Sequence, residues 1–215
     1  MKTRRIVLVL LLALALAPAS VADVRAQVGK GILDLNAIAE KDLAALPNIT
    51  PAIAKASVDK RPFASITDVQ AFLTSQGLTA EQTAVLYEKA FVHLNLNTCT
   101  VEEILLVPRI ARRMRIEFPE YRPWKSFAQF DKEIGKYLTA NPGELDRLKQ
   151  YVFIAMNVNT ASDDDLMTIP GMTAKALADL KKARPYASKA QFETEMGKAA
   201  GAKEAARLSR YLVIP

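Results

Sequence analysis

Few side chains of this protein have the types and spacing that covalent or metal chemistry needs. The chain contains one histidine, His93, and one cysteine, Cys99, so neither a His/Cys set of zinc ligands nor an intramolecular disulfide can form. Asp163, Asp164 and Asp165 form a run of carboxylates, but successive residues of a helix point about 100° apart, so the three cannot converge on one metal ion. No nucleophile–base pair or phosphate-binding loop is recognisable. We therefore expect a protein that is not an enzyme and that has no cofactor and no metal.

A group of four arginines could bind an anion. Arg109, Arg112, Arg113 and Arg115 lie close together in the sequence, and such a patch attracts polyanions such as the phosphate backbone of nucleic acid. Alternatively, the four arginines form a solvated surface that nearby carboxylates balance, namely those of Glu102, Glu103 and Glu117. The sequence leaves both interpretations open.

The N-terminus has the form of a secretory signal peptide. Lys2, Arg4 and Arg5 precede an apolar run over residues 6–17, which is too short to span a bilayer, since that takes about 20 residues. We expect residues 1–22 to be the signal, with cleavage after Ala22 or, as a second option, after Ala26. The mature protein is then periplasmic or extracellular. An uncleaved membrane anchor and a cytoplasmic location are the alternatives.

Loss of the signal changes the charge argument. The whole chain has 29 basic and 23 acidic residues, a net charge of +6, and three of the basic residues lie in the signal, so the mature chain carries +3. A weakly basic mature protein is compatible with nucleic-acid binding but does not argue for it.

Three copies of one unit fill the mature chain, at spacings of 61 and then 62 residues. The copies align without gaps from Leu35, Leu96 and Val158. The matching positions are Asn36, Asn97 and Asn159; Leu43, Ile104 and Leu166; Pro47, Pro108 and Pro170; and the Arg-Pro-aromatic sets that begin at Arg61, Arg122 and Arg184. Because almost no linker residues separate the copies, we expect them to pack against one another.

Local signals predict helices at the start of each copy. Thr100 with Glu103 and Ser162 with Asp165 have the spacing of a capping box, whereas Ala39 gives the first copy a weaker cap. The residue before each cap is apolar and is placed to pack on the helix that follows; in the second copy this residue is Cys99. In the first copy, Thr50-Pro51 predicts the start of a second helix.

The second half of each copy also has a readable pattern. The Arg-Pro-aromatic turn ends the second helix, and we expect its arginine to cap carbonyls of that helix or to pair with an acid of the same unit. A third helix led by a serine follows, and a short apolar stretch ends the copy, either as an extended connector or as the end of a helix. The aromatic residues of the turns are expected to be buried anchors: Phe63, Trp124 and Tyr186.

In the third copy, the segments Asn-Thr-Ala from Asn159, Ile-Pro-Gly-Met from Ile169 and Arg-Pro-Tyr from Arg184 resemble the helix-hairpin-helix module of the ComEA-like family of competence DNA-uptake receptors. The resemblance covers residues 35–215. It implies an all-α fold of three tandem helix-hairpin-helix-type (SAM/HhH-like) units after the signal peptide. Their expected bounds are 23–94, 95–156 and 157–215.

The resemblance also implies where DNA would bind. In that family the hairpin reads Gly-apolar-Gly, which lets backbone N–H groups at the start of the second helix face a phosphate. Here the hairpins are Asn48-Ile49-Thr50, Arg109-Ile110-Ala111 and Gly171-Met172-Thr173, so only the third keeps the first glycine and none keeps the second. The candidate nucleic-acid-binding residues are Gly171, Met172, Thr173 and Lys175, assisted by Arg109, Arg112 and Arg113.

The resemblance therefore implies an exported protein that binds the backbone of double-stranded DNA without sequence specificity. The same fold also occurs in exported structural proteins that do not bind DNA. The alternative is thus a structural or adaptor protein whose degenerate repeats contact a protein of the cell envelope. Neither hypothesis involves a small-molecule substrate or stable membrane insertion once the signal is removed.

Overall fold

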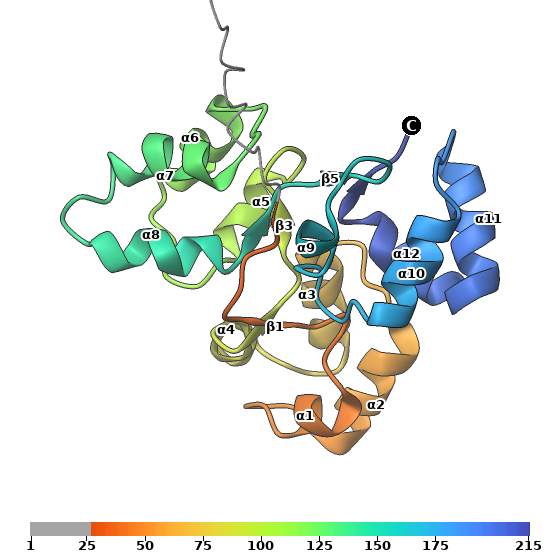
Figure 1. Ribbon diagram of the computed structural model, residues 1–215. Coiled ribbons are helices and arrows are strands. Elements are labelled where there is room, and N and C mark those ends of the chain that lie inside the picture. The colour runs from red at the N-terminus through yellow and green to blue at the C-terminus, as the bar shows by residue number, and fades with distance from the viewer. Residues whose placement is uncertain (1–26) are drawn as a thin grey trace, which may run out of the picture.

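The computed structural model describes residues 27–215, and the proposed signal peptide lies outside them. This part of the chain forms twelve helices and six two-residue strands (Figure 1). The elements repeat in one order, a strand, four helices and a strand, three times over. The first unit contains β1 (Leu33–Asp34), α1 (Glu40–Ala44), α2 (Pro51–Lys60), α3 (Ile66–Ser75), α4 (Ala80–Tyr87) and β2 (Ala90–Phe91).

The second and third units follow the same order. The second contains β3 (Leu94–Asn95), α5 (Val101–Leu105), α6 (Met114–Glu120), α7 (Phe127–Gly135), α8 (Pro142–Lys149) and β4 (Val152–Phe153). The third contains β5 (Met156–Asn157), α9 (Asp163–Leu166), α10 (Ala174–Lys182), α11 (Lys189–Ala200), α12 (Ala202–Ser209) and β6 (Leu212–Val213).

The strands correct the expectation of an all-α protein. The first and last strands of each unit pair in parallel, with Leu33 opposite Ala90, Leu94 opposite Val152 and Met156 opposite Leu212. The apolar stretch that ends each unit is largely buried, so its backbone N–H and C=O groups need partners inside the protein. The start of the same unit supplies them, and the stretch is extended rather than helical. The protein is therefore helix-rich with three small sheets.

Most of the helix caps that the sequence predicts are present in the structure. The Thr100 and Glu103 side chains form a complete capping box, and Thr50 accepts from the N–H of Ile53 in front of α2. Ser162 accepts from the N–H of Asp165, but the Asp165 carboxylate binds the Ser162 hydroxyl instead of a backbone N–H. The third unit therefore has half of the expected box.

The second helix of unit 2 is shorter than its counterparts. Helices α2 and α10 start directly after the capping threonines Thr50 and Thr173. Unit 2 has Ala111 at that position, and alanine cannot accept the capping bond. Helix α6 starts only at Met114, and its N-cap residue Arg113 forms no side-chain cap.

An asparagine clamp joins the two halves of each unit. The Asn36 side chain donates to the carbonyl of Phe63 over 3.0 Å and accepts from its N–H over 2.8 Å. Asn97 and Asn159 hold Trp124 and Tyr186 in the same way. The three aromatic residues are almost fully buried, as predicted, so each clamp fixes a core anchor relative to the first strand.

The arginines of the Arg-Pro-aromatic turns have partners other than those expected. Arg61 donates to the carbonyl of Ile38, and Arg184 to that of Ala161. Arg122 donates to the carbonyls of Leu96 and Cys99. These carbonyls precede the first helix of each unit instead of ending the second. The expectation of a cap on the second helix is thus wrong, because the turn folds the guanidinium back onto the start of the unit.

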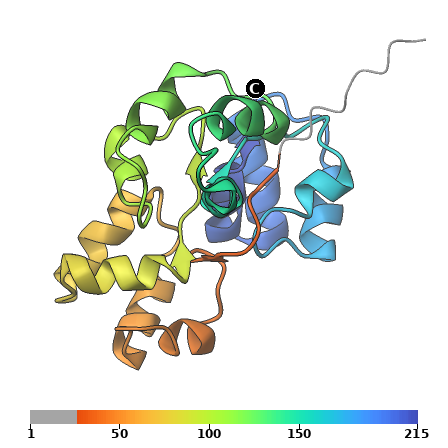
Figure 2. The ribbon, with the colours of Figure 1, turned by 90° about the vertical axis from the view of Figure 1, so that its left-hand side faces the viewer.

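The three units pack into one cluster instead of an extended row (Figures 1 and 2). One continuous core contains buried residues of units 1 and 2, where the rings of Phe91 and Tyr151 lie 5.1 Å apart. The rings of Phe153 and Tyr211 join units 2 and 3 with centroids 4.7 Å apart. The packing that the short connectors predicted is therefore present.

Candidate functional site

The first residue of each hairpin has a left-handed backbone. The φ angle is +63° at Asn48, +56° at Arg109 and +74° at Gly171. Glycine adopts this conformation freely and asparagine tolerates it, whereas a long side chain is strained there. The backbone turn of the hairpin is thus kept in all three units, although only unit 3 has the residue that suits it best.

The unit 3 hairpin presents unpaired backbone donors to solvent. Met172 is 8% exposed and anchors the turn in the core, and its N–H bonds the carbonyl of Ile169 over 3.0 Å. Thr173 caps α10 by accepting from the N–H of Ala176 over 3.1 Å. Within the described residues, the N–H groups of Thr173, Ala174 and Lys175 have no backbone or side-chain acceptor, as expected for the first turn of a helix. An anion could accept from them.

Lys175 stands beside these donors. Its side chain is 76% exposed, and its Nζ lies 2.7 Å from the Asp179 carboxylate and 3.4 Å from the carbonyl of Ala199. A surface pair of this kind is weak and can exchange for another anion. The structure therefore places Gly171, Thr173 and Lys175 together on the surface, with Met172 buried beneath them.

Two neighbours fix the back of this hairpin. Arg207 is 5% exposed; it donates to the carbonyl of Pro170 and to both carboxylate oxygens of Glu204. A Cβ on Gly171 would meet the Cβ of Ala37, in unit 1, at 3.1 Å. Position 171 thus requires glycine for its φ angle and also for this close approach.

The unit 2 hairpin is engaged with other parts of the protein. Arg109 pairs with Glu88 of unit 1 over 2.9 Å. Arg113 pairs with Glu117 over 2.7 Å and covers the ring of Tyr137 at 3.9 Å. Burial raises the pKa of Glu117, and the hydrogen bonds from Arg113 and Tyr137 lower it more, so the net pKa is below the ordinary value. Glu117 therefore balances Arg113 as that interpretation expects, whereas the partner of Arg109 is Glu88 instead of Glu102 or Glu103.

The other two arginines of this group are exposed. Arg112 and Arg115 form no ion pair within the described part of the chain. Figure 1 places α6 and α10 in different units on different sides of the cluster. The structure therefore does not bring the unit 2 arginines together with the unit 3 hairpin.

The unit 1 hairpin has fewer backbone donors for an anion than the unit 3 hairpin. The Asn48 side chain donates to the carbonyl of Gln82 over 3.2 Å, which ties the turn to α4. Pro51 occupies the first helical position and has no N–H to donate.

Units 1 and 3 each contain a second turn that we did not predict from the sequence. It lies between α3 and α4 in unit 1 and between α11 and α12 in unit 3. Gly77 and Gly201 have φ angles of +89° and +93°, and a Cβ on either would meet open space. After Gly77 come a buried Leu78 and the capping Thr79, which is the order of the unit 3 hairpin. In unit 1 the signal was Gly-Leu-Thr directly before a helix, and extending the comparison beyond the turns that follow Pro47, Pro108 and Pro170 would have found it.

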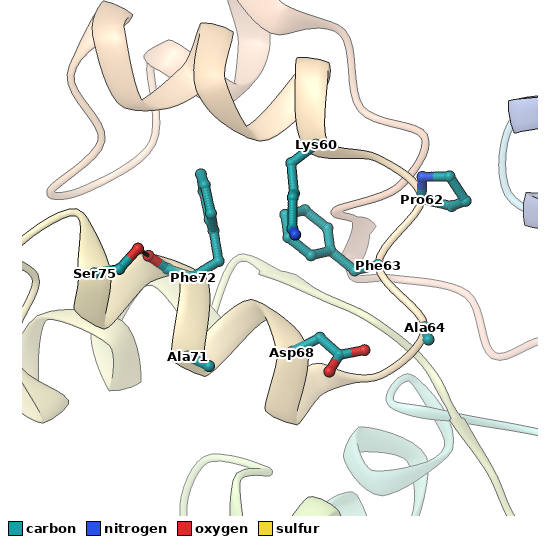
Figure 3. A pocket seen from close by; sticks show the side chains of 8 residues that line it. All are labelled: Lys60, Pro62, Phe63, Ala64, Asp68, Ala71, Phe72 and Ser75. Atoms are coloured by element: carbon teal, nitrogen blue, oxygen red, sulfur yellow. Dashed lines mark hydrogen bonds between the residues drawn. The ribbon is translucent and has the colours of Figure 1, made fainter.

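The hollow drawn in Figure 3 offers no comparable set of donors. It has a volume of about 470 Å³, lies between α2 and α3, and includes Lys60, Phe72 and Asp68 in its lining. The Asp68 carboxylate already accepts the N–H of Ser65 as part of a capping box. Lys60 is then the one lining side chain with an uncommitted charge, which does not define a site.

Two kinds of feature are absent from residues 27–215, namely a group of metal-ligating side chains and a helix that could span a membrane. In this range no three His, Cys, Asp or Glu side chains are grouped so that they could hold a metal ion. Within it, too, every helix is too short or too polar to cross a membrane.

Comparison with protein-family models, curated proteins and solved structures finds no match for this chain. The hairpins are therefore the part of the structure from which a function can be inferred.

Proposed function

We propose that this protein is an exported, non-enzymatic binding protein built from three helix-hairpin-helix units of the ComEA-like type. In this proposal it binds the backbone of double-stranded DNA, without sequence specificity, through the unit 3 hairpin. Residues 1–22 direct it to the periplasm or the extracellular space. The observation that carries the proposal is the exposed turn at Gly171, with three free N–H groups and Lys175 beside it.

The chemistry of the hairpin suits a phosphate. The free N–H groups at the start of α10 lie at the positive end of the helix dipole. Gly171 adds no side chain beside them, and Lys175, which pairs with Asp179 on the surface, can exchange this partner for a phosphate. None of these groups can read a base edge, so such a site would recognise the backbone alone.

Binding of the purified mature protein to a random duplex across a salt series tests the proposal. A hairpin that neutralises one or two phosphates predicts a slope of log K against log salt of about −1 to −2. The variant Lys175→Ala should bind every duplex more weakly. The matched control is Lys189→Ala, since Lys189 is also exposed and paired with an acid four residues on. No binding by the wild type at low salt would rule the proposal out.

A protein-binding role is the second candidate, and one feature favours it. A groove of about 340 Å³ runs between units 1 and 2 and is lined largely by apolar residues, among them Ala84, Leu105 and Pro108. Leu105 is 44% exposed there. An adaptor that uses this groove predicts that Leu105→Glu abolishes capture of a stoichiometric envelope protein, while Ile116→Glu on the exposed face of α6 does not. Equal capture by both variants would count against it.

A further inference from the structure

The outer edge of the unit 2 sheet is covered by a segment that precedes the first unit. Val28 forms an antiparallel bridge with Phe153 of β4, and its side chain is 2% exposed. Two backbone hydrogen bonds flank this pair, from the N–H of Gly29 to the carbonyl of Val152 over 3.0 Å and from the N–H of Ile154 to the carbonyl of Gln27 over 3.2 Å. The edge of β4 that faces away from β3 is thus closed by an extended strand.

The same edge of unit 3 has no such cover in the described part of the chain. Strand β6 bonds the β5 segment through Tyr211 and Val213, whose carbonyls accept backbone N–H groups at β5 and just after it. Successive backbone groups of a strand point to opposite edges, so the carbonyl of Leu212 and the N–H of Ile214 face away from β5. Among residues 27–215 neither of these two groups has a hydrogen-bond partner.

The edge of β6 is also accessible. The corresponding edge of unit 1 lies inside the protein, since Ala90, Phe91 and Val92 are all 0% exposed. By contrast, Val213 is 53% exposed, and the C-terminus lies at the upper rim of the cluster in both views (Figures 1 and 2). An exposed strand edge is a template for pairing with another strand. Among the closing strands of the three described units, β6 alone is left open to a strand from outside.

We propose that this edge binds a second copy of the chain, with the β6 strands of the two molecules paired antiparallel about a two-fold axis at Val213. The dimer does not depend on whether the protein binds DNA. In an antiparallel ladder, two hydrogen bonds flank each non-hydrogen-bonded pair, and each runs from the residue after one member to the residue before the other. The two-fold axis therefore places the N–H of Ile214 opposite the carbonyl of the partner's Leu212, and the reverse. Both unpaired groups of each edge gain a partner.

The unit 2 edge is a precedent for this arrangement within the same fold. The bonds around Phe153 and Val28 use the backbone positions of β4 that correspond to Leu212 and Ile214 of β6. A surface that is complementary to itself suits a two-fold dimer, which is the commonest soluble oligomer. Residues 211–215 contain no charged side chain, so the pairing brings no like side-chain charges together. Strand edges that avoid pairing usually carry such charges.

The dimer should be weak and should depend on concentration. In unit 2 the covering strand belongs to the same molecule, whereas a second copy loses translational and rotational freedom when it binds. Two strand hydrogen bonds and the contact of two valines are few beside the roughly ten hydrogen bonds of a typical protein interface. We therefore expect monomers in dilute solution and a growing fraction of dimers as the protein concentration rises.

The variant Val213→Cys tests the two-fold axis. The Cα atoms of a non-hydrogen-bonded antiparallel pair lie about 4.5 Å apart, within the range of about 4.4–6.8 Å that a disulfide bridges. With oxidised glutathione as the oxidant, this variant should form covalent dimers at a rate that rises with protein concentration. Met167→Cys is the matched control, because Met167 is an apolar residue of the same unit, is 47% exposed and lies outside the strands. Cys99 does not react in the folded protein, because it is buried and burial raises the pKa of its thiol to about 11.

A second variant tests the hydrogen bonds. Ile214→Pro in the Val213→Cys background removes the outward N–H and leaves the bonds between β6 and β5 in place. Because the two-fold pair then loses two hydrogen bonds, cross-linking should slow by at least about fivefold. Thermal unfolding checks that the doubly substituted protein is folded.

Hydrogen exchange of the Ile214 amide in the wild type gives an independent readout. Its exchange should slow as the protein concentration rises. The dimer is refuted if Val213→Cys cross-links no faster than Met167→Cys, or if folded Ile214→Pro cross-links at an unchanged rate. Protection of the Ile214 amide that is already complete in dilute solution also refutes it, because the edge is then covered within one molecule. Should Ile214→Pro fail to fold, the concentration dependence of this exchange decides.

Discussion

The asparagine clamps make a quantitative prediction about stability, which Asn36→Ala tests most sharply. Asn36 is 5% exposed, and its side chain satisfies both the N–H and the C=O of Phe63, which is itself 3% exposed. Alanine would leave these two buried backbone groups without partners. Each such group costs about 1–3 kcal/mol, so we expect the free energy of unfolding to fall by about 2–4 kcal/mol.

Urea unfolding followed by fluorescence, together with thermal unfolding, provides the measurement. For a protein of this length the predicted loss corresponds to a fall in Tm of roughly 5–15 °C. Asn141→Ala is the matched control, because Asn141 is exposed and its side chain forms no cap in front of α8; it should change stability by less than about 0.5 kcal/mol. If Asn36→Ala were as mild as this control, the clamp would not be a principal link between the two halves of the unit.

Three further predictions concern single positions. Gly171→Ala should lower the free energy of unfolding more than Gly77→Ala does. Both positions have positive φ, but only a Cβ at 171 would press on Ala37. We expect the two free energies, measured by urea unfolding, to differ by about 1 kcal/mol. The Cys99 thiol, whose pKa burial raises to about 11, should resist alkylation at mildly alkaline pH until urea unfolds the protein; rapid labelling of the native protein would contradict this. Burial raises the pKa of Asp34, but its hydrogen bonds with His93 and Tyr211 lower it more. The net pKa of Asp34 is below its ordinary value, so the stability that its carboxylate provides is present at neutral pH and is lost as the pH falls below about 4. Asp34→Asn should therefore be less stable at neutral pH, and its unfolding free energy should fall less steeply in acid than that of the wild type. An unchanged acid dependence would contradict the assignment.

Much of the local structure could be predicted because it depends on neighbours in sequence. The caps at Thr50 and Thr100 work over three residues, and each satisfies an N–H group that any helix leaves free. The turn at Gly171 is likewise a local requirement on φ. The recurrence of these signals at fixed spacing was enough to predict three helical units, the burial of their aromatic residues and the packing forced by short connectors.

The contents of the candidate site were only partly predictable. Gly171, Thr173 and Lys175 lie together as expected, since they follow one another in one turn and helix start. The sequence also grouped Arg109, Arg112 and Arg113 with them, but these side chains lie in another unit, and Arg109 and Arg113 pair with Glu88 and Glu117. A spacing in sequence does not state how whole units are oriented.

The sequence by itself therefore determined the helical units, most of their caps and the left-handed turn at Gly171, because these follow from short-range backbone chemistry. Only the tertiary structure decided that the ends of each unit pair as parallel strands and that Arg61 turns back onto the carbonyl of Ile38. It alone brought Tyr211 onto Asp34, residues at opposite ends of the described chain. Such contacts depend on which buried polar groups still lack a partner once the units have packed. No local sequence pattern specifies which groups these are.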